Sequence, residues 1–106
     1  MKISDILQKK QSLSFEFFPP KEPSQESVLF ETINELKPFA PDFTSITYGA
    51  GGSTRDKTMV WSQILAKDFT TMMHLTCYGN DSTSINKTCE AMKAAGITNI
   101  LVLRGD

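Results

Sequence analysis

The sequence has few of the residues that would mark a disulfide-rich, membrane-spanning or nucleic-acid-binding protein. Its two cysteines, Cys77 and Cys89, form no framework of pairs, so we expect both thiols to be reduced. Eleven basic residues against twelve acidic ones disfavour a nucleic acid partner. No apolar run approaches the roughly 20 residues of a membrane span, and the start lacks the apolar core of a secretory signal. We therefore expect a cytoplasmic protein of at most one domain, with no membrane partner.

Four short segments rich in β-branched or aromatic residues recur at a regular interval. They are LSFEFF, FTSITY, TMMHLTC and NILVLRGD, which begin at residues 13, 43, 71 and 99. The stretches between them carry apolar residues at helical spacing. The positions that indicate this spacing are Leu29, Ile33 and Leu36, then Trp61, Leu65 and Asp68 beside Val60 and Ile64, then Ile85, Cys89 and Met92. A short extra helix is expected over residues 2 to 10.

Polar residues of the N-cap type mark the start of each predicted helix. Ser24 precedes the first, Ser53 stands in capping-box spacing with Asp56 before the second, and Ser82 is near the start of the third. Gly96 is placed to end the third helix.

Strands that alternate with helices at a steady period predict an α/β fold with parallel strands joined by right-handed crossovers. This pattern is compatible with two folds, a doubly wound sheet and a (β/α)₈ TIM barrel. An eight-stranded barrel needs roughly 250 residues, and residues 1 to 106 supply about its first four strands. We therefore expect the N-terminal part of a single barrel domain, truncated after strand 4.

In such folds the chemistry collects at the carboxyl ends of the strands. The four predicted strands offer polar residues there, namely Glu16, then Thr47 and Tyr48, then His74 and Thr76, then Arg104 and Asp106. A purely structural sheet would have little use for this set.

Glu16 lies in a run of aromatic residues and is the first of these to question. It could pair with a cation, lie at a solvated edge, or act in catalysis. Surrounded by Phe15, Phe17 and Phe18, its neutral form would be favoured by desolvation, which makes it a candidate general acid. His74 is the single histidine; lone strand histidines are more often core groups than ligands, and no second spaced pair completes a metal site.

The segment GAGGSTRDK, residues 49 to 57, joins the second strand to its helix. Its glycines permit close approach of a ligand to the backbone beside a helix N-terminus. The segment departs from the phosphate-loop pattern at Asp56 and from the dinucleotide pattern at Thr54. A plain tight turn and an anion site both remain open.

Together, SFEFFPPK, ITYGAGGSTRDKT, HLTC and ILVLRGD, in this order and spacing, closely resemble the methylenetetrahydrofolate reductases. The resemblance covers the whole chain. It implies a (β/α)₈ barrel with non-covalent FAD that reduces 5,10-methylenetetrahydrofolate to 5-methyltetrahydrofolate. NADH or NADPH would supply the hydride, and the product would supply methyl groups for methionine synthesis.

The same resemblance implies roles for individual residues. Glu16 matches the general acid that protonates the folate, and Asp106 would lie near both flavin and pterin. The positions that match cofactor contacts are Thr47, Tyr48, Ala50, His74, Arg104, Gly105 and Asp106. The full-length protein would be a homo-oligomer. Two other possibilities stay open: a non-catalytic fragment of such a barrel, and a pterin-dependent methyltransferase barrel without flavin.

Overall fold

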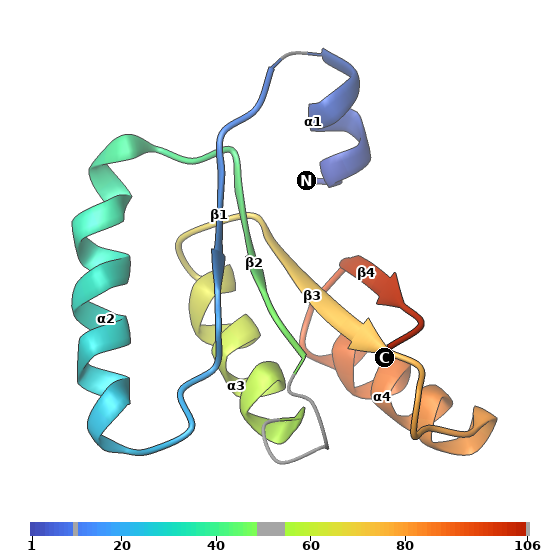
Figure 1. Cartoon of the computed structure of the whole chain (residues 1–106). Helices are drawn as coiled ribbons and strands as arrows, with labels where there is room; N and C mark the ends of the chain where they lie inside the picture. Colours follow the sequence, from blue (N-terminus) through green and yellow to red (C-terminus); the bar gives the residue numbers. More distant parts are fainter. Residues whose placement is uncertain (10, 49–54, 106) are drawn as a thin grey trace.

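The structure of the chain, a computed structural model, describes residues 1–9, 11–48 and 55–105. Strands and helices alternate along it as the sequence predicts (Figure 1). The strands are β1 (Ser14–Phe17), β2 (Phe43–Ile46), β3 (Thr71–Thr76) and β4 (Asn99–Leu103). The helices are α1 (Ile3–Lys9), α2 (Ser24–Leu36), α3 (Arg55–Ala66) and α4 (Ser82–Ala94), with a 3₁₀ turn, η1 (Lys37–Phe39), after α2.

All four strands are parallel and lie in the order β1-β2-β3-β4, which is also their order in the sequence. A doubly wound sheet reverses its strand order at a switch point, whereas a barrel adds each strand beside the previous one. The described sheet has no such reversal. The observed order therefore corresponds to the N-terminal part of a (β/α)₈ barrel, as expected.

One face of the sheet forms the hydrophobic core with the helices. Phe17, Ile46 and Met73 occupy one row across β1, β2 and β3, since Phe17 pairs with Ile46 and Ile46 with Met73. These side chains pack in one cluster with α2, α3 and α4 through Ile33, Trp61, Leu65 and Met92, and with Ile97 just before β4. The helical periodicity in the sequence thus identified these buried residues of the helices. It was wrong for Val60, which is 51% exposed, and Asp68 lies beyond the end of α3 at Ala66.

The opposite face carries Glu16, Ser45 and His74, whereas the hydroxyls of Thr44 and Thr71 pair on the side that faces the helices. Glu16 pairs with Ser45, and Ser45 with Met72, so these three form the neighbouring row across the sheet. Because successive strand residues point to opposite faces, this row faces away from the helices. His74 follows two residues after Met72 on the same face of β3.

The helix ends agree with the sequence only in part. Gly96 follows α4 with φ of +78°, as expected for a residue that ends a helix. The cap of α4 is Asp81 and not Ser82: its carboxylate accepts from the backbone N–H of Ser84, whose hydroxyl accepts from the N–H of Asp81. Ser24 begins α2 directly, with Pro23 in the cap position and no side-chain cap. Ser53 lies outside the described residues.

The amino-terminal helix α1 is tied to the far end of the sheet by Asn99, the first residue of β4. The Asn99 side chain accepts from the N–H of Ile3 at 2.9 Å and donates to the carbonyl of Met1 at 3.0 Å. Ile3 and Ile6 are buried. Figure 1 shows α1 beyond the end at which β1 begins, so it covers the end of the sheet opposite the expected site.

Strand β4 exposes apolar side chains on both faces. Ile100 and Val102 are paired with the core-facing Met73 and Leu75, and Leu101 and Leu103 point the other way, yet all four are at least a third exposed. Within the described part of the chain, no helix has both the length and the apolar character needed to cross a membrane.

Candidate functional site

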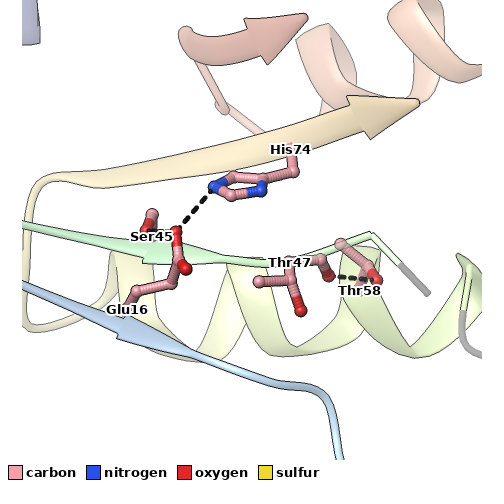
Figure 2. A network of polar contacts seen from close by, with 5 residues as sticks. All are labelled: Glu16, Ser45, Thr47, Thr58 and His74. Atoms are coloured by element: carbon pink, nitrogen blue, oxygen red, sulfur yellow. Dashed lines mark hydrogen bonds and ion pairs between the residues drawn. The ribbon is translucent and has the colours of Figure 1, made fainter. Parts of the chain in front are cut away.

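The polar face of the sheet brings Glu16, Ser45 and His74 together from three adjacent strands (Figure 2). The Ser45 hydroxyl donates to Oε1 of Glu16 at 3.1 Å. Nε2 of His74 lies 3.2 Å from the same oxygen. Nε2 is buried and has no hydrogen-bond partner in the described structure, so its approach to Glu16 is a close electrostatic contact without hydrogen-bond geometry. The first and third predicted strands therefore do bring their site residues together.

Our prediction that phenylalanine side chains surround Glu16 is wrong. Phe17 is buried in the helix-side core and Phe15 packs against that core, both on the face opposite Glu16. Phe18 is 73% exposed. The Glu16 side chain is itself about half exposed, at 52%. Its immediate surroundings are therefore the hydroxyl of Ser45 and the imidazole of His74, not aromatic rings.

The imidazole of His74 is the buried member of this group. Its burial lowers the pKa of His74 below the ordinary 6.5, and the negative charge of Glu16 opposes that shift without cancelling it. The ring is therefore mainly neutral at pH 7. In the described structure, Nε2 of this ring lies beside Oε1 of Glu16 and makes no hydrogen bond.

The end of β2 is fixed by contacts on both sides. The N–H of Thr47 donates to the carbonyl of Phe17 at 3.0 Å, and its own carbonyl accepts from the hydroxyl of Thr58 on α3 at 2.9 Å (Figure 2). The next residue, Tyr48, accepts at its phenol oxygen from the amide of Asn80 at 3.4 Å, a long contact. Asn80 also donates to the carbonyl of Thr76 at 2.8 Å. Asn80 thus links the ends of β2 and β3.

The segment after β4 runs beside the segment after β3. The N–H of Tyr78 donates to the carbonyl of Arg104 at 2.9 Å. Gly105 has φ of +95°, and a Cβ there would lie 2.7 Å from Cγ2 of Thr76 and 2.8 Å from Cβ of Tyr78. Only glycine fits this position without displacing its neighbours. The Arg104 side chain is exposed.

Lys57, near the start of α3, has its ammonium group occupied by the protein itself. It donates to the carbonyls of Pro20 at 3.1 Å and Lys21 at 2.8 Å. This lysine therefore fastens the loop after β1 to α3, which favours a structural role for it over phosphate binding. The glycine-rich residues 49–54 lie outside the described residues.

The predicted site residues thus form three groups: Glu16 with His74 on the polar face of the sheet, Thr47 with Tyr48 after β2, and Arg104 with Gly105 after β4. Ala50 and Asp106 lie outside the described residues. Sequence analysis missed Ser45. The alternation in FTSITY could have indicated that Ser45 shares a face with Thr47, but its pairing with Glu16 depends on the register of β1 and β2.

Known proteins resemble this chain in sequence over nearly its whole length. The family model described as methylenetetrahydrofolate reductase matches residues 2–106. The chain is 41% identical over 108 residues to methylenetetrahydrofolate reductase (NADH) 1 of Arabidopsis thaliana, covering 99% of this chain and 18% of the relative. It is 39% identical over 95 residues to 5,10-methylenetetrahydrofolate reductase of Buchnera aphidicola, covering 88% of this chain and 32% of the relative.

The similarity extends to other bacteria. The 5,10-methylenetetrahydrofolate reductase of Pectobacterium carotovorum is 33% identical over 102 residues, covering 94% of this chain and 34% of the relative. The chain therefore spans about a third or less of the length of these curated relatives. The family match covers nearly every residue, and the chain belongs to the methylenetetrahydrofolate reductase family.

Proposed function

We propose that this chain contributes the catalytic acid and part of the cofactor site to an enzyme that reduces 5,10-methylenetetrahydrofolate to 5-methyltetrahydrofolate. The observation that carries the proposal is the group formed by Glu16, Ser45 and His74 on the polar face of the sheet. Membership of the reductase family supports the choice of folate as substrate. A carboxyl group that is half exposed and anchored at one oxygen can reach a bound substrate.

Three features of this chain support a flavin site in this proposal. Nε2 of His74 is a buried polar atom without a hydrogen-bond partner among the described residues. Gly105 keeps the backbone after β4 close to β3, with no room for a side chain. Thr47, Tyr48 and Arg104 lie at the same end of the sheet. We infer that these residues, together with Ala50 and Asp106, hold FAD, which when bound supplies hydride transfer from NADH or NADPH to the folate.

Glu16 acts on the folate as a general acid in this proposal. Its O–H bond breaks as an N–H bond forms at a nitrogen of the five-membered folate ring, and the ring opens to a cationic iminium. The carboxylate left behind keeps the hydrogen bond from Ser45, which stabilises its charge. Protonation by solvent then restores the acid for the next turnover.

We also propose that residues 1–106 are the N-terminal part of one barrel domain. The exposed apolar residues of β4 on both of its faces support this, because further strands and helices of a barrel would cover them. We further propose that the full-length protein is a cytoplasmic homo-oligomer and, by family resemblance, that its product supplies methyl groups for methionine synthesis.

The experiment that tests the reaction uses the full-length gene product. We expect a yellow protein whose flavin absorbance bleaches with NADH or NADPH under anaerobic conditions and returns when methylenetetrahydrofolate is added, with methyltetrahydrofolate as product. A colourless protein that transfers a methyl group from a pterin would instead support the methyltransferase alternative. A full-length protein with neither activity would support the non-catalytic alternative.

The role of Glu16 is tested by comparing two substitutions. Glu16→Gln removes the acidic proton but keeps the size of the side chain. We expect it to leave flavin reduction unchanged and to slow flavin reoxidation by folate about 10²- to 10⁴-fold, the usual contribution of a general acid. The matched control is Glu31→Gln, on the exposed surface of α2, which should affect neither half. Equal losses in both halves would contradict the assigned role.

A further inference from the structure

The two oxygens of the Glu16 carboxyl group are not equivalent in this structure. Both contacts recorded for the group in the described residues, from the Ser45 hydroxyl at 3.1 Å and from Nε2 of His74 at 3.2 Å, are made at Oε1. Figure 2 shows the three side chains converging between β1, β2 and β3. The carboxyl group is thus held from one side.

The register of the sheet makes this asymmetry a property of the fold. Ser45 is paired with Glu16 across β1 and β2, so the two side chains leave the same face at neighbouring positions. Ser45 is 5% exposed, and its neighbours in the strand, Thr44 and Ile46, are fully buried on the other face. The hydroxyl therefore has little freedom to turn away from Glu16.

Of the two groups at Oε1, the hydroxyl of Ser45 is the one with hydrogen-bond geometry. The buried imidazole of His74 is mainly neutral, so it does not neutralise a carboxylate as an ammonium or guanidinium group would. It also makes no hydrogen bond to Oε1. The orientation of the carboxyl group therefore depends chiefly on Ser45.

We propose that Ser45 is a positioning residue that occupies Oε1 of Glu16 and so assigns the acidic proton to Oε2, the oxygen that delivers it to the substrate. The delivery step rests on the proposed function. A hydroxyl that donates to Oε1 engages the carbonyl oxygen of the neutral acid, and the proton resides on the other oxygen. After transfer, the same hydrogen bond stabilises the carboxylate.

The first test is spectroscopic and needs neither flavin nor turnover. Infrared difference spectra between acidic and neutral pH show the C=O stretch of protonated carboxyl groups, and loss of a band in Glu16→Gln identifies the one from Glu16. We expect this band to move to higher frequency in Ser45→Ala, because the carbonyl oxygen loses a hydrogen bond, and to stay near its original position in Ser45→Thr, which keeps a hydroxyl. An unmoved band in Ser45→Ala would overturn the proposal.

The second test is kinetic and uses the two half-reactions of the full-length protein. We expect Ser45→Ala to slow flavin reoxidation by folate roughly 10- to 100-fold, the loss associated with a hydrogen bond to a charged group, while flavin reduction is unchanged. The solvent deuterium isotope effect on reoxidation should rise, because proton delivery becomes the slow step. Ser45→Thr should restore most of the rate.

The matched control is Ser62→Ala on α3. It also removes a fully buried serine hydroxyl, but one without a hydrogen-bond partner in the described structure, and should leave both half-reactions and the isotope effect unchanged. Equal losses in both halves for Ser45→Ala would show a structural role and overturn the positioning role. The infrared band could move in Ser45→Ala while Glu16→Gln leaves flavin reoxidation unchanged. That result would refute the proposed function and the delivery of the proton by Glu16, but it would support the hydrogen bond between Ser45 and Glu16.

Discussion

Nε2 of His74 lies 3.2 Å from Oε1 of Glu16, but burial of the imidazole outweighs the attraction of the carboxylate. The pKa of His74 is therefore lowered and not raised by the pair. This relationship differs from a simple salt bridge, in which the carboxylate would hold the histidine in its charged form. It has a measurable consequence for stability.

We expect His74 to make the protein less stable as the pH falls below about 6.5. A histidine with a lowered pKa in the folded state binds fewer protons there than in the unfolded state, so stability falls with pH from about the unfolded pKa down to the folded one. Urea midpoints measured between pH 7.5 and 5.5 should fall more in the wild type than in His74→Gln, which has no ionisable group at this position.

Glu16→Gln provides the internal control for the same titration. Removing the negative charge removes the influence that raises the pKa of His74, so the fall in stability with decreasing pH should become larger than in the wild type. A smaller fall in Glu16→Gln would contradict this account, because it would mean that the carboxylate disfavours the charged imidazole.

Any side chain at position 105, which is now Gly105, should destabilise the protein. Gly105→Ala combines a positive φ with contacts below 3 Å to Thr76 and Tyr78, and we expect a loss of about 2–4 kcal/mol in the free energy of unfolding. Gly96→Ala is the matched control, since it has φ of +78° but no atom within 4 Å of the added Cβ. It should lose about 1 kcal/mol from backbone strain alone. Chemical denaturation of both variants measures the difference, and equal losses would disprove crowding at Gly105.

Removing each of two buried hydroxyl groups on α3 should change the stability of the protein by a different amount. Thr58 donates to the carbonyl of Thr47, whereas Ser62 has no partner among the described residues, and both are fully buried. We expect Thr58→Val to cost about 1 kcal/mol or more and Ser62→Ala to be neutral or stabilising, because an unpaired buried hydroxyl carries only a desolvation penalty. Thermal unfolding of the two variants decides this, and a larger loss in Ser62→Ala would show that its hydroxyl has an essential contact.

The sequence predicted the order of elements because hydrophobic periodicity reflects burial directly. Leu65 and Met92, chosen for their helical spacing, are both fully buried in the core. The sequence did not show which residue caps α4, because Asp81 and Ser82 are both good N-caps. The extended backbone of Asp81 in the structure decides between them.

The sequence predicted the polar residues of the candidate site on each strand, but not the contacts between residues of different strands. Each strand end supplied its polar residue, but the contact between Ser45 and Glu16 joins residues 29 positions apart and depends on register. The expected aromatic surroundings failed for a related reason: neighbours in sequence along a strand point to opposite faces, so Phe15 and Phe17 could not surround Glu16.

Asn99 joins α1 to the sheet across nearly the whole length of the chain. Its side chain accepts from Ile3 and donates to Met1, so Asn99→Ala removes both hydrogen bonds and should cost about 1–3 kcal/mol. Amide hydrogen exchange in residues 3–9 should accelerate, because α1 has only two buried side chains besides these contacts to hold it.

Asn99→Asp separates the two contacts, because a carboxylate still accepts from Ile3 but has no hydrogen to donate to Met1. We expect exchange rates between those of the wild type and Asn99→Ala. Rates in residues 71–76 should stay unchanged in both variants, since β3 is hydrogen-bonded on either side by β2 and β4. Equal acceleration in α1 and β3 would show that Asn99 supports the whole sheet and not the helix alone.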